Sequence, residues 1–322
     1  MKTSIIFIIA AVVFAAAQKK TTFSDQQQNV SVTISSALLN INRMSAWYSD
    51  NGQSERNPKT NNSGVAYPRG TSYAVYASGI LMGGYVNDGL QSGPRVTGFL
   101  YNPGFSVGAI LGLRTGETED PSKSDVRIYR IRNDYALADL KLDAAETNMI
   151  DSAAVDSNQI RAVRDQYKKD WLEWPAQKGA PFYDADQDGK YSPKFEMKNG
   201  KEIPILYPDA DEPGLAGAHQ VIWYVANDVR TMQSPWKTEA IGIEVQATIW
   251  GYNFSSNHGL GNSIFKRNRI IYKGTVSTPP SSTRKRRMHR CPKPTWQALR
   301  PINRWRKYSA MPASRWRHRA IA

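Results

Sequence analysis

The chain has 322 residues and a formal net charge of +14, from 42 Lys and Arg against 28 Asp and Glu, and it contains a single cysteine. This length allows one large domain or two ordinary ones, each with a buried core. The lone cysteine, Cys291, excludes an intramolecular disulfide, so stability has to come from core burial, bound metal or neighbouring molecules.

The amino-terminal residues predict export. Lys2 precedes an apolar run from Ile5 to Phe14, and the small residues of 15–17 follow it. This is the layout of a secretory signal peptide, and the run is shorter than the ~20 residues that span a bilayer. We expect residues 1–17 to be a signal peptide cleaved near Ala17. The mature protein is then secreted or held at the cell surface, with no transmembrane span.

The excess positive charge lies at the other end. From Thr275 onward there are 13 Lys or Arg and no Asp or Glu, and without these and Lys2 the chain holds 28 basic and 28 acidic residues. Interleaved Arg and Trp, as in 304–306, suit nucleic acid or an anionic surface. This basic tail, however, has no helical or strand period. We therefore interpret 275–322 as disordered and out of frame, the true sequence being truncated or frameshifted after about Gly274.

In chain order, residues 18–39 read as a polar lead-in and a first strand, and 40–274 as a β-rich extracellular region. A Gly-, Asn- and Pro-rich segment at 52–70 predicts a long loop. Apolar segments interrupted by glycine, 72–86 and 95–113, favour strands because they are rich in β-branched and aromatic residues. Residues 125–132 alternate and predict a half-buried strand.

One segment departs from this β pattern. Residues 144–174 contain no Gly or Pro, and apolar side chains recur there at spacings of three and four: Ile160, Val163, Tyr167, Trp171 and Trp174. Ser157 is a suitable N-cap and Pro175 ends the run. We predict an amphipathic helix over about 157–174 that packs its apolar stripe on a sheet.

Three long strands follow, at 219–228, 240–250 and 263–274. The first is almost entirely apolar, as expected for a strand buried on both faces, and the second alternates without interruption. Because no βαβ rhythm links them, we predict a mainly β fold of antiparallel, β-sandwich-like sheets with the single amphipathic helix.

The segment "YDADQDGKYSP" predicts a calcium-binding loop. Asp184, Asp186 and Asp188 occupy the first, third and fifth positions of such a loop, Gly189 suits the sharp turn, and Lys190 would offer its carbonyl. The twelfth position is Phe195 and not a glutamate, so the loop is no EF-hand, and further oxygens have to come from elsewhere. The nearest candidates are Asp209, Asp211 and Glu212. The alternative is a simple acidic turn.

Four blocks of the chain, 170–193, 211–229, 241–253 and 262–274, resemble a family of large exported Bacteroidota-type proteins, many with a type IX secretion sorting domain. Residues 42–84 are similar to the same family's amino-terminal part. By this resemblance, Asp184, Asp186, Asp188 and Gly189 match the family's calcium-type loop, and Asp211 matches a later acidic position. An insertion that includes 194–208 separates the two here. The resemblance also implies further β-rich sequence beyond Gly274.

Three functions stay open. The first is a cell-surface or extracellular structural or interaction protein with a calcium-stabilised loop and no catalytic activity. The second is a secreted, polysaccharide-directed hydrolase that uses two carboxylates from the set Asp184, Asp186, Asp209, Asp211 and Glu244. The third is nucleic-acid or anionic-surface binding through the basic tail. We expect no nucleophile elbow, and no Walker loop, His-Glu-x-x-His motif or Gly-x-Gly-x-x-Gly fingerprint occurs. His219 and His258 stand alone, and Trp223 is expected in the core.

Overall fold

The computed structural model describes residues 34–88, 93–98, 104–229, 238–255 and 258–275. The predicted signal peptide, 1–17, lies outside the described residues. So do most of the lead-in, 18–39, and all of the basic tail beyond Thr275.

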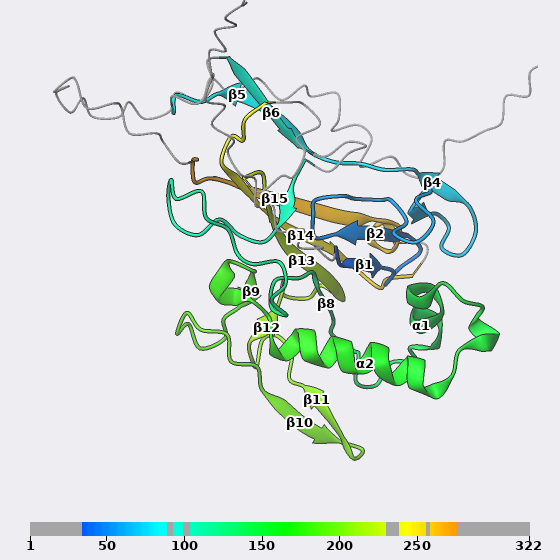
Figure 1. Ribbon diagram of the computed structural model, residues 1–322. Helices are drawn as coiled ribbons and strands as arrows, with labels where there is room; N and C mark the ends of the chain where they lie inside the picture. The colour runs from blue at the N-terminus through cyan, green and yellow to red at the C-terminus, as the bar shows by residue number, and fades with distance from the viewer. Residues whose placement is uncertain (1–33, 89–92, 99–103, 230–237, 256–257, 276–322) are drawn as a thin grey trace, which may run out of the picture. The chain divides into compact units, whose positions relative to one another are not determined.

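The largest sheet has five antiparallel strands (Figure 1). β13 (Gln220–Asn227) lies at its centre and pairs along its whole length with β14 (Ile243–Gly251), which in turn pairs with β15 (Ile264–Tyr272). Two short strands share the other side of β13: β8 (Tyr129–Arg132) pairs with its first half, and β7 (Ser106–Val107) with its end.

A second antiparallel sheet packs on one face of the first. It contains β1 (Ser36–Leu39), β2 (Ser45–Ser49), β3 (Val65–Ala66) and β4 (Tyr73–Val75). One buried cluster joins side chains from both sheets, among them Leu39, Tyr48, Tyr224, Val245 and Ile249. The prediction of a mainly β, sandwich-like fold of antiparallel sheets is therefore confirmed.

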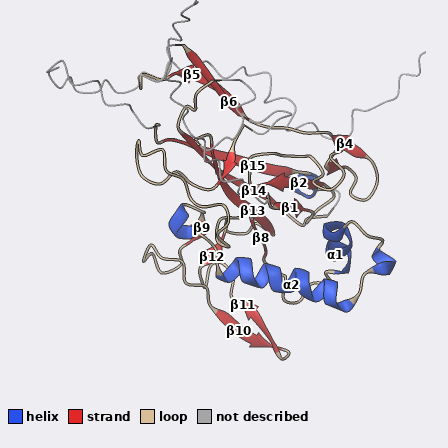
Figure 2. Cartoon of the chain, viewed as in Figure 1, coloured by secondary structure: helices blue, strands red, loops and turns tan. Residues whose placement is uncertain are grey.

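Helices cover the opposite face of the five-stranded sheet. α1 (Lys141–Asn148) contacts α2 (Ser157–Leu172), and α2 packs against β8; Figure 2 draws the helices in blue. A second buried cluster includes Tyr167, Trp171 and Trp174 together with Val221 and Trp223 of β13. Alternate residues of β13 thus enter different clusters, which explains its uniformly apolar sequence.

The predicted helix is present, with one correction at its start. Asp156, not Ser157, is the N-cap: its side chain accepts a hydrogen bond from the Gln159 N–H, and the Gln159 side chain accepts one from the Asp156 N–H. This reciprocal pair is a capping box. The helix ends at Leu172, two residues before Trp174, which is buried in the turn that follows.

The helix α1 was not predicted. Its buried side chains are two alanines and Asp143, so it carries no apolar stripe that a periodicity analysis would detect. Its C-cap is Met149, whose backbone is left-handed and whose N–H bonds back to the last turn.

The remaining elements are short. β5 (Leu81–Tyr85) pairs with β6 (Pro94–Gly98), β9 (Phe182–Tyr183) with β12 (Glu212–Pro213), and β10 (Phe195–Lys198) with β11 (Lys201–Pro204). Single 3-10 turns lie at Ser152–Ala154, Ala176–Lys178 and Gly259–Asn262. None of the helices in the described part of the chain has the length and apolar character to cross a membrane.

Candidate functional site

The acidic loop follows β9, and a short strand pair brings it next to Asp211. Tyr183 of β9 pairs with Glu212 of β12, so the residues just outside this pair, Asp184 and Asp211, lie side by side. One carboxylate oxygen from each of Asp184, Asp186 and Asp211 lies within 4.8 Å of the other two. Three carboxylates thus converge on one point.

Asp211 holds both ends of the loop. It is buried, and its Oδ1 accepts a hydrogen bond from the Ala185 N–H at 2.9 Å, while its Oδ2 accepts one from the Ser192 N–H at 2.8 Å. Asp211 is therefore both the least exposed member of the cluster and the one that orders the loop.

Asp184 shapes the turn inside the loop. Its two oxygens accept from the N–H groups of Asp188 at 3.2 Å and Gly189 at 2.8 Å. Gly189 has a φ of +76°, a conformation that side chains with a Cβ rarely adopt. The glycine at this position, which the sequence pattern singled out, has a backbone reason to be there.

Other predicted ligands take different positions. The Asp188 carboxylate is not part of the three-residue cluster, and its Oδ1 accepts from the Lys190 N–H at 2.7 Å. Asp209 is exposed. Glu212 is buried and accepts from the Tyr207 N–H; burial raises its pKa, and that hydrogen bond only partly opposes the rise.

The insertion between the loop and Asp211 folds separately. Residues 195–204 form the β10–β11 hairpin, whose turn is Asn199 and Gly200, both at positive φ. The first and last residues of the hairpin lie side by side, because Phe195 pairs with Pro204. The insertion therefore does not prevent Asp211 from reaching the loop.

A cavity of about 400 Å³ borders the loop. The end of α2 and the turn after it supply Leu172, Glu173 and Trp174, and the loop supplies Gly189 to Tyr191. The Tyr191 hydroxyl donates to the Trp171 carbonyl at 2.7 Å, which fixes the loop against the helix.

The donor set suits a hard divalent cation. Three carboxylates lie together, and no Lys or Arg in the described part of the chain forms an ion pair with any of Asp184, Asp186, Asp188 or Asp211. Grouped anionic oxygens repel one another unless a cation compensates them, and calcium takes oxygen ligands in flexible geometry. Asp184, Asp186 and Asp211 would hold such an ion.

The fifth carboxylate considered for hydrolysis, Glu244, has another role. It is buried in β14 and accepts from the Lys273 ammonium at 2.6 Å and from the Ile110 N–H at 2.9 Å. Gln246 donates to its other oxygen at 2.9 Å. Both oxygens are therefore engaged in structural contacts: with Lys273 just after β15, with Gln246 of β14 and with the segment after β7.

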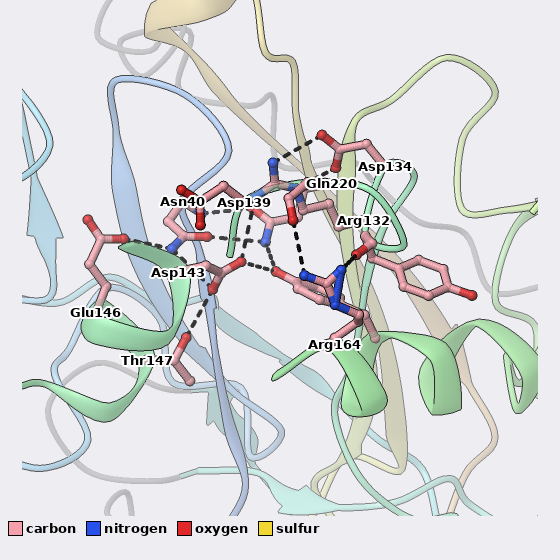
Figure 3. Close-up of polar contacts among 12 residues, drawn as sticks. Asn40, Arg132, Asp134, Asp139, Asp143, Glu146, Thr147, Arg164 and Gln220 are labelled. Carbon is pink, nitrogen blue, oxygen red and sulfur yellow. Dashed lines mark hydrogen bonds and ion pairs between the residues drawn. The ribbon is translucent and has the colours of Figure 1, made fainter. Parts of the chain in front are cut away.

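A second polar cluster, shown in Figure 3, lies between the sheet and both helices. Its centre is Asp143 of α1, which is 1% exposed. Arg130 of β8 donates to Asp143 Oδ1 at 2.6 Å, and the Tyr167 hydroxyl of α2 donates to Oδ2 at 2.7 Å. The sequence motifs and spacings did not predict this cluster, because its members come from separate helices and strands.

The same cluster continues into both sheets. The Gln220 amide of β13 donates to the Tyr167 hydroxyl at 2.8 Å, and its carbonyl accepts from the Asn40 N–H at 2.8 Å. Arg130 also donates to the Asn40 side chain at 2.8 Å. Burial alone would raise the pKa of Asp143, but Arg130, Tyr167 and Arg132 outweigh it and hold that pKa below its usual range.

A cavity of about 250 Å³ lies beside this cluster, lined by Arg130, Thr147, Gln159 and Tyr167 among others. The carboxylate of Asp143 already accepts hydrogen bonds on both oxygens, and Arg130 and Tyr167 are its donors. Groups paired in this way are not poised for proton transfer to a ligand. The cluster ties together β1, β8, β13, α1 and α2.

No nucleophile elbow was expected, but a Gly-x-Ser-x-Gly sequence does occur at 104–108. In hydrolases this motif marks a serine on a sharp strand-to-helix turn. Here Ser106 lies in β7 and pairs with Asn227, and the next described helix, α1, begins only at Lys141. The required strand–turn–helix context is absent around this serine.

Most of the described tryptophans are core residues. Trp47, Trp171, Trp174 and Trp223 are each at most 8% exposed, which confirms the prediction for Trp223. His219 packs edge-on against Tyr252 and Phe254, and burial lowers its pKa. It therefore serves as part of an aromatic cluster.

Comparison with known proteins adds no relative. No family model, no curated protein and no solved structure matches this chain.

Proposed function

We propose that this is an exported protein of the cell surface or extracellular space, with a structural or interaction role and no catalytic activity, in which calcium stabilises the loop after β9. The observation that carries the proposal is the convergence of Asp184, Asp186 and Asp211 within 4.8 Å, with no cationic side chain among the described residues to compensate them. The ion would join the loop to β12 and so fasten the segment that carries the β10–β11 hairpin.

Two sequence features support the location. The layout of Lys2, the apolar run and the small residues that follow is that of a secretory signal peptide. The body of the chain contains no cysteine, so a metal ion would take the stabilising place that disulfides hold in many exported proteins. The resemblance to large exported Bacteroidota-type proteins points the same way.

The test is a thermal melt with calcium, with magnesium and with excess chelator. A ligand present at about 100 times its dissociation constant adds about 2.7 kcal/mol to the stability of the folded state. We expect calcium to raise the melting temperature and chelator to reverse the rise. A transition that moves with neither would make the loop an acidic turn and end the proposal.

Two variants give the experiment its specificity. Asp186→Asn removes a ligand that, among the described residues, accepts only a long hydrogen bond, from the Asp188 N–H at 3.3 Å, so the variant should fold. It should lose the calcium-dependent rise. Asp209→Asn is the matched control, because Asp209 is exposed and lies near the cluster in sequence without belonging to it. It should keep the full rise.

A further inference from the structure

β15 is the last strand of the five-stranded sheet. Among the described residues it pairs with β14 alone, and the two strands keep one register over all nine residues, from Ile264 opposite Gly251 to Tyr272 opposite Ile243 (Figure 1). The strand contains no proline and no bulge. A long, regular edge of this kind can accept another strand.

The direction of the backbone groups follows from the hydrogen bonds at the strand ends. The Lys273 N–H donates to the Gly242 carbonyl at 2.8 Å, toward β14. Because N–H and C=O groups alternate in direction along an antiparallel strand, every second residue of β15 turns its backbone outward. In β14 the carbonyls of Ile243 and Gly251 accept hydrogen bonds from the N–H groups of Asp228 and His219, on the side of β13. The backbone of β14 therefore alternates in direction in the same way.

The outward set is Ile264, Lys266, Asn268, Ile270 and Tyr272. None of their N–H or C=O groups bonds to another group in the described part of the chain. Such a row of free donors and acceptors is the template on which strand addition depends.

The side chains on this edge are also incompletely covered. Ile270 is 48% exposed and Tyr272 is 45% exposed, whereas their partners in β14, Val245 and Ile243, are each 3% exposed. The apolar layer of the core therefore continues past β14 into side chains that the described elements cover only in part. A neighbouring strand would bury them.

The charge of β15 selects the kind of neighbour. The strand carries Lys266, Arg267 and Arg269 and no acidic residue, and none of the three forms an ion pair with a described residue. A second copy of β15 would bring like charges together, and the residues after Thr275 contain no Asp or Glu. Cross-strand pairs of opposite charge are the favourable ones.

We propose that the outer edge of β15, unpaired among the described residues, binds an extended, acidic segment of another protein, which adds to the sheet as a sixth, antiparallel strand. Backbone pairing with the outward residues supplies affinity. Acidic side chains opposite Arg267 and Arg269 and apolar ones over Ile270 and Tyr272 supply selectivity. This inference rests on β15 alone and needs no calcium in the loop after β9.

The test uses the full-length chain and labelled peptides of the same length as β15 that alternate valine and glutamate. The glutamate peptide and a second peptide with lysine in place of glutamate are each made in two forms, one unmodified and one N-methylated at alternate amides so that it cannot pair. Fluorescence anisotropy measures binding. The basic residues after Thr275 attract both acidic peptides equally, so the difference between these two reports the strand edge.

We expect the unmodified acidic peptide to bind about tenfold or more tightly than its N-methylated form. The double variant Arg267→Glu, Arg269→Glu should lose that difference for the acidic peptide and show it for the lysine peptide. Both side chains are exposed, so the variant should fold, and circular dichroism checks this. Equal binding of the two acidic peptides, no binding, or a dimer of the chain paired through β15 would each overturn the proposal.

Discussion

Asp50 illustrates at the scale of one residue how burial changes a side chain's chemistry. It lies at the end of the β1–β2 hairpin, 1% exposed, and accepts hydrogen bonds from the backbone and the hydroxyl of Ser35. Burial raises its pKa to about 6, although the bonds from Ser35 act in the opposite direction. The folded state therefore binds a proton near pH 5 that the unfolded chain does not.

This shift predicts a pH dependence. Because the pKa is higher in the folded state, the contribution of Asp50 to stability falls as the pH rises from about 4 to about 6, by about 3 kcal/mol in total. Asp50→Asn removes this dependence. The free energy of unfolding of the variant minus that of the wild type, measured with urea, should rise by about that amount from pH 4 to pH 7.

Asp165→Asn is the control for this measurement, since Asp165 is exposed on α2. Its difference from the wild type should stay constant over the same range. A constant difference for Asp50→Asn as well would contradict the assignment.

The Asp143 cluster predicts a large loss of stability. Asp143→Ala leaves the buried guanidinium of Arg130 without its carboxylate and the Tyr167 hydroxyl without its acceptor. Breaking a buried ion pair from one side costs about 3–5 kcal/mol. Since the pKa of Asp143 is lowered in the folded state, its contribution is lost on acidification, and the cost should shrink at low pH. Urea unfolding at neutral and acidic pH measures both effects; an undiminished cost at low pH would contradict the ion-pair account.

At the scale of an element, α2 shows which features of a helix can be predicted from the periodicity of its apolar residues. Its stripe, which includes Val163, Tyr167 and Trp171, was readable because the residues recur at helical spacing and are all buried. Its start was not, because Asp156 and Ser157 are both good caps by type. The capping box formed with Gln159 decides between them.

The capping box gives a direct test. Asp156→Ala removes the side-chain acceptor for the Gln159 N–H and should cost about 1 kcal/mol. Ser157→Ala is the matched control one residue away and should change the free energy of unfolding by only a few tenths of that, since alanine suits a helical position. Thermal or urea unfolding separates the two, and the reverse order of effects would place the cap at Ser157.

At the scale of the whole molecule, the residues after Thr275 carry 13 Lys or Arg, no Asp or Glu, and no helical or strand period that would give them an apolar face to pack on a core. A chain ending at Thr275 should therefore melt at the temperature of the full chain. It should also lose retention on a heparin or DNA column, because the residues up to that point balance in charge apart from the amino-terminal segment. Specific binding of nucleic acid by the shortened chain would contradict this view of the tail.

The sequence by itself determined what depends on neighbouring residues: the strands with period two, the helix with its apolar stripe, and the acidic loop with its glycine at positive φ. Local periodicity reports which side chains of an element share a face, but not whether the other face is covered: in β14 the polar face, with Glu244, Gln246 and Thr248, is buried as well. The spacing of Asp184 and Asp186 is likewise a local feature that can be read from neighbouring residues.

Only the tertiary structure decided which distant residues meet. Asp211 reaches the loop because β12 pairs with β9, and Asp143 meets Arg130 because α1 and α2 cover the same face of the sheet. The same holds for the outer edge of β15, which pairs with no second strand in the part of the chain that the structure describes and which depends on strand order. These contacts arise from sheet register and chain crossing, and neither leaves a periodic signal in the residues that take part.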